Sequence, residues 1–181
     1  MTIEVEIRSF LTPERYQDLL AFFSKEGISM GTEEQETHYL DLDNDLRIQQ
    51  NPSYSKIWMK KGKIHDESRE ETEVRLPAEG FGPISRIFEK IGLSPKVKWF
   101  RTRNTFSWNG VSVMLDHTKG YGHIIELEIL TDEKGKEAAL ESLKQRLAEI
   151  GVPLTPREEF QKRYESYVQN WKEHTGSTDN P

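Results

Sequence analysis

The chain has 181 residues, of which 34% are hydrophobic and 31% are charged, and its net charge is −6. Its 4 Trp, 6 Tyr and 8 Phe indicate a folded core, whereas the negative charge disfavours duplex nucleic acid or an anionic membrane as a partner. The absence of cysteine excludes disulfides and thiolate metal sites. Because the sequence shows neither an apolar run of membrane-spanning length nor a secretory signal pattern, we predict a cytoplasmic protein.

The length favours one domain, which we expect to cover residues 1–175 and to be followed by a loose polar tail at residues 176–181. In chain order, the predicted elements are strand 3–9, helix 12–27, strands 45–49, 56–60 and 69–76, helix 84–92, strands 99–106, 111–116 and 124–129, and helices 140–151 and 155–171. The apolar stripes of the four helices are interpreted as packing faces.

The predicted strands share an unusual pattern, in which one face is apolar and the other is charged. Residues 3–9 read IEVEIRS, so that Glu4, Glu6 and Arg8 share one face. Like charges also recur in pairs on other strands, and these pairs are Glu71 with Glu73, Glu126 with Glu128, and Arg101 with Arg103. A solvated face would tend to intersperse opposite signs, because adjacent like charges repel.

Two arrangements of these strands are compatible with the pattern. One is a sheet with helices on its apolar side and water on its charged side. The other is a barrel with helices outside, which would place every charged face in its lumen. Carboxylates at positions i and i+2 can hold a hard divalent ion, and rows of Arg and Lys can hold phosphate oxygens. A charged lumen would therefore be balanced by a polyanion and metal ions.

Several segments resemble motifs of one known superfamily. Glu4-Val-Glu6-Ile-Arg8 resembles the ExExK signature of the CYTH or triphosphate tunnel metalloenzyme superfamily, which includes class IV adenylyl cyclases, thiamine triphosphatases and inorganic tripolyphosphatases. Further segments resemble the family motifs in the same order, namely YLDLDNDLRIQ, KIWMKKG, REETEV, FRTRNTF, VMLDHTKGYGHIIELEI and ESYVQNW. The signature alone is a weak signal, whereas the ordered set is a strong one.

The resemblance implies an α+β fold, in which an eight-stranded antiparallel β-barrel forms a tunnel and helices pack outside it. It also implies Mg²⁺ or Mn²⁺ as cofactor and a triphosphate as the small-molecule partner. Carried over by position, the metal ligands are Glu4, Glu6, Glu126 and Glu128. The triphosphate-binding residues are Arg8, Arg47, Lys56, Lys60, Arg69, Arg101 and Arg103. The catalytic acidic residues are Glu71, Glu73 and Asp116.

Two positions depart from the family pattern within the tunnel face. Arg8 replaces the lysine of the signature, and Gln49 stands where the family has a second arginine, which removes one charge that could bind phosphate. The register of the KIWMKKG strand is chosen so that Lys60, and not Lys61, shares a face with Lys56.

The leading hypothesis is a metal-dependent hydrolase of triphosphates, with inorganic tripolyphosphate preferred over ATP. Trp58 is the one aromatic residue expected in the tunnel, and no segment clearly supplies an adenine pocket. An adenylyl cyclase that uses the same tunnel is a second hypothesis. A module that binds polyphosphate or nucleotide without turnover is the third, and a homodimer is left open.

Overall fold

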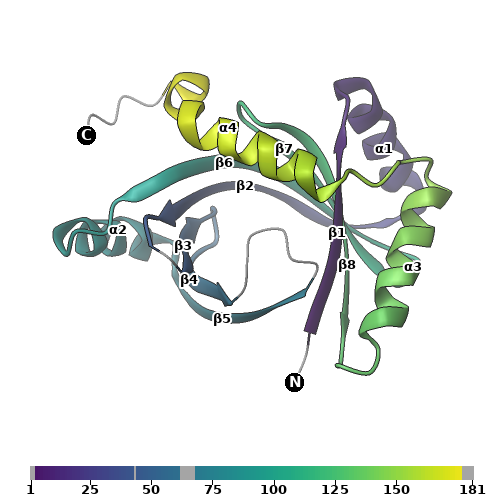
Figure 1. The fold of residues 1–181 in the computed structure, drawn as a ribbon, viewed down its shortest axis with the longest axis horizontal. Coiled ribbons are helices and arrows are strands. Elements are labelled where there is room, and N and C mark those ends of the chain that lie inside the picture. The colour runs from purple at the N-terminus through teal and green to yellow at the C-terminus, as the bar shows by residue number, and fades with distance from the viewer. Residues whose placement is uncertain (1–2, 43, 62–67, 177–181) are drawn as a thin grey trace.

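The computed structural model describes residues 3–42, 44–61 and 68–176 (Figure 1). The strands are β1 (Ile3–Leu11), β2 (Ile28–Leu40), β3 (Asp45–Gln50), β4 (Tyr54–Lys61), β5 (Ser68–Pro77), β6 (Pro95–Trp108), β7 (Val111–Thr118) and β8 (Gly122–Thr131). The helices are α1 (Pro13–Glu26), the short 3₁₀ helix η1 (Ala78–Gly80), α2 (Phe81–Lys90), α3 (Lys136–Glu149) and α4 (Arg157–Thr175). Among these helices, none is long and apolar enough to cross a membrane.

The strands form a closed antiparallel barrel in the order β1-β5-β4-β3-β2-β6-β7-β8. β1 pairs with β8 along its whole length, but it pairs with β5 only through Glu4 with Arg69 and Val5 with Ser68. A closed barrel gives every strand an inner and an outer face, so residues that alternate along a strand alternate between the lumen and the outside. The predicted fold class is therefore confirmed, and the water-facing sheet is not formed.

The largest hydrophobic core lies outside the barrel, between β1, β7 and β8 and the two helices α1 and α3 (Figure 1). α1 begins after Thr12, whose Oγ1 accepts a hydrogen bond from the backbone N–H of Arg15 at 3.2 Å, and Pro13 follows as its first residue. Its apolar stripe includes Phe23, which is fully buried in this core together with Leu143 of α3. The charged faces of these strands are thereby directed to the inside of the barrel.

The other two helices behave differently from each other. α4 packs its Tyr167 and Trp171 against Val97 and Trp99 of β6, as a packing stripe should. The stripe of α2 does not follow this expectation, because Ile87 is 58% exposed to solvent. The interpretation of that stripe as a packing face is therefore wrong for this residue.

One long strand, β2, has no counterpart among the elements predicted from the sequence. Residues 32–38 read TEEQETH, and this stretch is polar on both faces. It forms a strand because it lies between β3 and β6 and pairs with both. A strand held by its neighbours needs no apolar face of its own, so period-two hydrophobicity could not reveal it.

Candidate functional site

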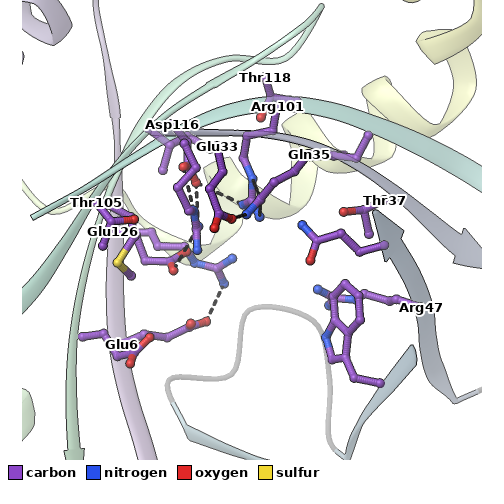
Figure 2. A pocket seen from close by; sticks show the side chains of 18 of the residues that line it. Glu6, Glu33, Gln35, Thr37, Arg47, Arg101, Thr105, Asp116, Thr118 and Glu126 are labelled. Carbon is purple, nitrogen blue, oxygen red and sulfur yellow. Dashed lines mark hydrogen bonds and ion pairs between the residues drawn. The ribbon is translucent and has the colours of Figure 1, made fainter. Parts of the chain in front are cut away.

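The inner faces of the strands enclose a cavity of about 470 Å³ (Figure 2). The site residues predicted from the sequence that line it are Glu4, Glu6, Arg8, Arg47, Lys56, Lys60, Glu71, Arg101, Arg103, Asp116, Glu126 and Glu128. Glu73 is not among the lining residues and instead binds Lys56, which does line the cavity, at 2.8 Å. The side chain of Arg69 lies outside the part of the chain that the structure describes.

Four carboxylates gather on the wall formed by β1 and β8. Glu6 stands directly opposite Glu128 in the strand register, and such like-charge pairs repel. Burial, followed by repulsion from Glu4, Glu126 and Glu6, raises the pKa of Glu128 to about 7. Burial also raises the pKa of Glu4, although Lys60 opposes this shift. Burial is thus the main reason that both pKa values are raised, and the neighbouring carboxylates add to it.

Among the described side chains, Lys60 of β4 reaches this wall from across β5. Its Nζ lies 3.2 Å from an oxygen of Glu4 and 3.1 Å from an oxygen of Glu71. Burial lowers its pKa, but Glu6, Glu4 and Glu71 together raise it above the ordinary value. The ammonium group is therefore held charged inside the barrel, as the chosen register requires.

The carboxylate wall fits a hard divalent cation by the chemistry of its donors. Oxygen ligands are what Mg²⁺ and Mn²⁺ prefer, and a cation would relieve the repulsion that raises the pKa of Glu128. Within the described residues, however, no three acidic or histidine side chains already converge as a metal site. Mg²⁺ is commonly held by one or two carboxylates together with the phosphates of a substrate, so a shared site agrees with this arrangement.

The neighbouring wall, formed by β6 and β7, carries two guanidinium groups that share one carboxylate (Figure 2). Asp116 accepts a hydrogen bond from Nη1 of Arg101 at 3.0 Å and two from Arg103, at 2.8 Å from Nε and 2.7 Å from Nη2. The Asp116 side chain is 3% exposed. Because both of its oxygens are engaged, it fixes the two guanidiniums in place.

The guanidiniums also act on the adjoining wall. Nη2 of Arg103 lies 3.2 Å from Glu126. Burial alone would raise the pKa of Glu126, but Arg103, Arg8 and Arg101 together lower it to about 2. Glu126 is therefore a firmly ionised partner of these cations, unlike Glu128 two residues further along the same strand.

Sequence reasoning missed the residues of β2 that hold this network. Gln35 accepts hydrogen bonds from Nε and Nη2 of Arg101 at 3.0 and 2.7 Å, and it donates one to Glu33 at 3.0 Å. Both Gln35 and Glu33 line the cavity. Only the alternation of Glu33, Gln35 and Thr37 with the outer residues could have pointed to them, once β2 was recognised as a strand.

The opposite side of the cavity, formed by β3 and β4, has cations that already possess counter-charges. Nε of Arg47 donates to Asp45 at 2.6 Å, and the guanidinium lies 4.3 Å from the centre of the Tyr39 ring. Nζ of Lys56 donates to Glu73 and lies 4.3 Å from the centre of the Trp58 ring. Asp45 was not predicted, although it lies two residues before Arg47 on β3 and alternation along the strand would have placed it on the same face.

Several aromatic rings line the cavity, and here the expectation from the sequence was wrong. Besides Trp58, the aromatic lining residues are Tyr39, Tyr54, Trp99, Tyr121, Phe160 and Tyr164. Phe160 and Tyr164 come from α4, which approaches the barrel only in the tertiary structure. Ring centres of Trp99 lie 4.5 Å from Tyr121 and 5.9 Å from Tyr39, so these rings pack on one another.

The sequence and the fold both have counterparts among known families and structures. Residues 2–159 match the model of the CYTH domain family. Among curated proteins, none matches the chain. A conserved hypothetical protein from Pyrococcus furiosus is similar in structure, with 22% identity, coverage of 85% of this chain and 96% of that one, and a TM-score of 0.72.

Two further solved structures that are similar to this one belong to proteins named for an enzymatic activity. A putative adenylyl cyclase from Hippeastrum, described as revealing a dominant triphosphatase activity, is 20% identical over 92% of this chain and 96% of its own, with a TM-score of 0.66. A putative adenylate cyclase from Vibrio parahaemolyticus is 16% identical over 88% and 98%, also with a TM-score of 0.66. At these identities the likeness shows the fold, and the match of the family model shows that the chain belongs to the CYTH domain family.

Proposed function

We propose that this protein is a metal-dependent hydrolase of triphosphates and that inorganic tripolyphosphate is its substrate. The observation that carries the proposal is the pairing of two unlike walls in one buried cavity. The β1–β8 wall has an excess of carboxylate, and the β6–β7 wall presents two guanidiniums that share Asp116. A polyphosphate bound with a divalent cation complements both walls at once.

The guanidiniums of Arg101 and Arg103 would bind the phosphate oxygens. Gln35 and Asp116 hold them in fixed orientations before a ligand arrives. Donors that are positioned in advance stabilise charge that spreads over phosphate oxygens during bond cleavage without the cost of reorganisation. Arg8 and Lys60, which line the same cavity, would add further positive charge.

Glu4 and Glu128, with Glu6 and Glu126 beside them, would hold Mg²⁺ or Mn²⁺. The ion supplies charge neutralisation to phosphate oxygens when it is bound. The chain's own contribution is the carboxyl oxygens of this wall, and a bound cation would favour the ionised forms of Glu4 and Glu128, whose pKa values are raised in its absence.

The acidic residues predicted as catalytic have different places in the structure. Asp116 is fully engaged by guanidiniums, so we propose that it positions Arg101 and Arg103. Glu71 lines the cavity beside Lys60 and is the better placed of the remaining two to contact an attacking water. A largely dissociative transition state asks little of a general base, so positioning would dominate the rate.

We keep the proposed preference for tripolyphosphate over ATP, but the reason for it changes because aromatic rings do line the cavity. Trp99 already contacts Tyr39, Tyr121, Tyr164 and Tyr167 in tilted or edge-on arrangements, so its ring is packed among other rings. A nucleoside would have to displace these contacts or extend from another part of the cavity. The cytoplasmic location and the homodimer stay predictions.

One assay tests the proposal against its alternatives. The purified protein is incubated with tripolyphosphate, ATP or thiamine triphosphate in Mg²⁺ or Mn²⁺, and the products are separated. Orthophosphate release, with the highest kcat/KM for tripolyphosphate, is expected. Cyclic AMP with pyrophosphate would indicate a cyclase, an activity named for two structural relatives. Tight binding without product would indicate a binding module.

A further inference from the structure

Gln49 of β3 has a buried amide group that the interactions described above do not use. Its side chain is 3% exposed and lines the cavity. Among the described residues, none accepts a hydrogen bond from its Nε2. An unpaired buried donor costs about 1–3 kcal/mol, so such a group in a binding cavity calls for an acceptor.

The adjacent residue shows what an ordinary glutamine does on this strand. Gln50 points to the outside of the barrel, where its Nε2 donates to Glu36 at 2.8 Å. Two consecutive residues of the same type thus differ in one respect, since the outward amide is paired and the inward amide is not. The unpaired donor therefore lies on the cavity side of β3, where a ligand would bind.

The position of β3 in the ring decides which part of a ligand Gln49 would meet. In the strand order, β3 is three strands from β1 and four strands from β8, so it faces the carboxylate wall across the barrel. Figure 2 shows Arg47, the inward neighbour of Gln49 on β3, across the cavity from Glu6 and Glu126. A triphosphate that meets a cation at the carboxylates would therefore turn another phosphate toward Gln49.

The charge around Gln49 is nearly balanced without a ligand. Arg47 is paired with Asp45, and Lys56, directly opposite Gln49 in the register, is paired with Glu73. On the β6–β7 wall, by contrast, two guanidiniums share Asp116. The β3–β4 side therefore offers a neutral donor to a phosphate and little unpaired positive charge.

We propose that the Gln49 amide donates a hydrogen bond to a phosphate oxygen of the bound triphosphate and, being uncharged, limits the advantage of tripolyphosphate over triphosphate esters. This inference rests on the proposed function, because it takes the ligand to be a triphosphate. The free end of tripolyphosphate carries more negative charge than an esterified phosphate. A cationic side chain at position 49 would bind the free end of tripolyphosphate more strongly than an esterified phosphate. The neutral amide discriminates less between these two groups.

The test compares Gln49→Leu and Gln49→Arg with Gln50→Leu, a matched change that faces outward on the same strand. Affinity is measured by calorimetry with imidotriphosphate, a non-hydrolysable analogue, in the presence of Mg²⁺. Loss of one hydrogen bond should weaken binding to Gln49→Leu about fivefold. Gln50→Leu should bind as the wild type does. Gln49→Arg should raise the ratio of kcat/KM for tripolyphosphate to that for ATP.

Thermal unfolding without ligand separates ligand binding from a structural role. Removing an unpaired buried donor should leave the melting temperature of Gln49→Leu equal to or above that of the wild type. Unchanged affinity in Gln49→Leu, whatever its melting temperature, would overturn the inference even if tripolyphosphate is hydrolysed. Binding that depends on Gln49 but gives no product would uphold the inference and overturn the proposed hydrolase.

Discussion

Glu126 and Glu128 lie two residues apart on β8, and both face the cavity, yet their environments act in opposite directions. Three arginines lower the pKa of Glu126 to about 2, whereas burial and three other carboxylates raise that of Glu128 to about 7. The first belongs to a network in which guanidiniums are in excess. The second belongs to a group in which carboxylates are in excess.

Under the proposed function, these two environments would serve two kinds of ligand. The β6–β7 wall keeps its guanidiniums in place with Asp116 and Gln35, which suits phosphate oxygens. The β1–β8 wall stores repulsion that a divalent cation would relieve. If this distinction is correct, substitutions on the two walls should have opposite effects on the stability of the free protein.

The largest effect is expected on turnover when the carboxylate wall is neutralised. Glu4→Gln and Glu128→Gln should each lower kcat/KM for tripolyphosphate by about 100-fold or more, because a bound metal supplies several kcal/mol of charge stabilisation. EDTA should abolish turnover of the wild type. Glu137→Gln, on the exposed surface of α3, is the matched control. Full activity of both variants, with circular dichroism showing intact folds, would remove the metal assignment.

The next largest effect concerns Asp116. Asp116→Asn leaves two partly buried guanidiniums without their shared carboxylate, and the free energy of unfolding should fall by about 3 kcal/mol. Urea denaturation of the ligand-free protein measures this change. Asp18→Asn, with a side chain 70% exposed, should change the stability little. Equal losses in the two variants would show that Asp116 does not anchor the guanidiniums.

Ligand binding should stabilise the protein by a comparable amount. Tripolyphosphate with Mg²⁺ at one hundred times its dissociation constant should add about 2.7 kcal/mol, because it binds only the folded state. Thermal unfolding with and without the two ligands provides the measurement. Arg103→Gln, which removes a cation of the β6–β7 wall, should reduce the gain. An unchanged melting curve at saturating ligand would speak against a triphosphate site.

A further expected effect is the pH dependence that Glu128 contributes to the stability of the metal-free protein. Its folded pKa of about 7 lies above the ordinary 4.5, so its favourable contribution is complete below about pH 4.5 and is lost as the pH rises through 7. The melting temperature should therefore fall more steeply over this window in the wild type than in Glu128→Gln. Parallel curves for the two proteins would show that Glu128 is not held against repulsion.

Much of the candidate site followed from the sequence, because the barrel turns alternation along a strand into an inner and an outer face. Arg101 with Arg103 and Glu126 with Glu128 could be assigned to one face without knowledge of the fold. The order of the motifs then indicated a closed barrel, which the structure has. Glu73 was the exception among the described side chains, because it is not one of the lining residues and instead accepts hydrogen bonds from Lys56 and Arg75.

The tertiary structure alone decided how these charges are balanced. β2 has no apolar face, so the supporting role of Gln35 appears only when β2 lies beside β6. The aromatic lining depends on α4, which follows β8 by many residues and meets Trp99 only after the chain has folded back. Local periodicity records which face a side chain occupies, whereas its partners come from distant segments. For that reason the sequence revealed most of the charged residues that enter the tunnel, whereas the fold added the β2 and aromatic residues and determined which side chains are paired.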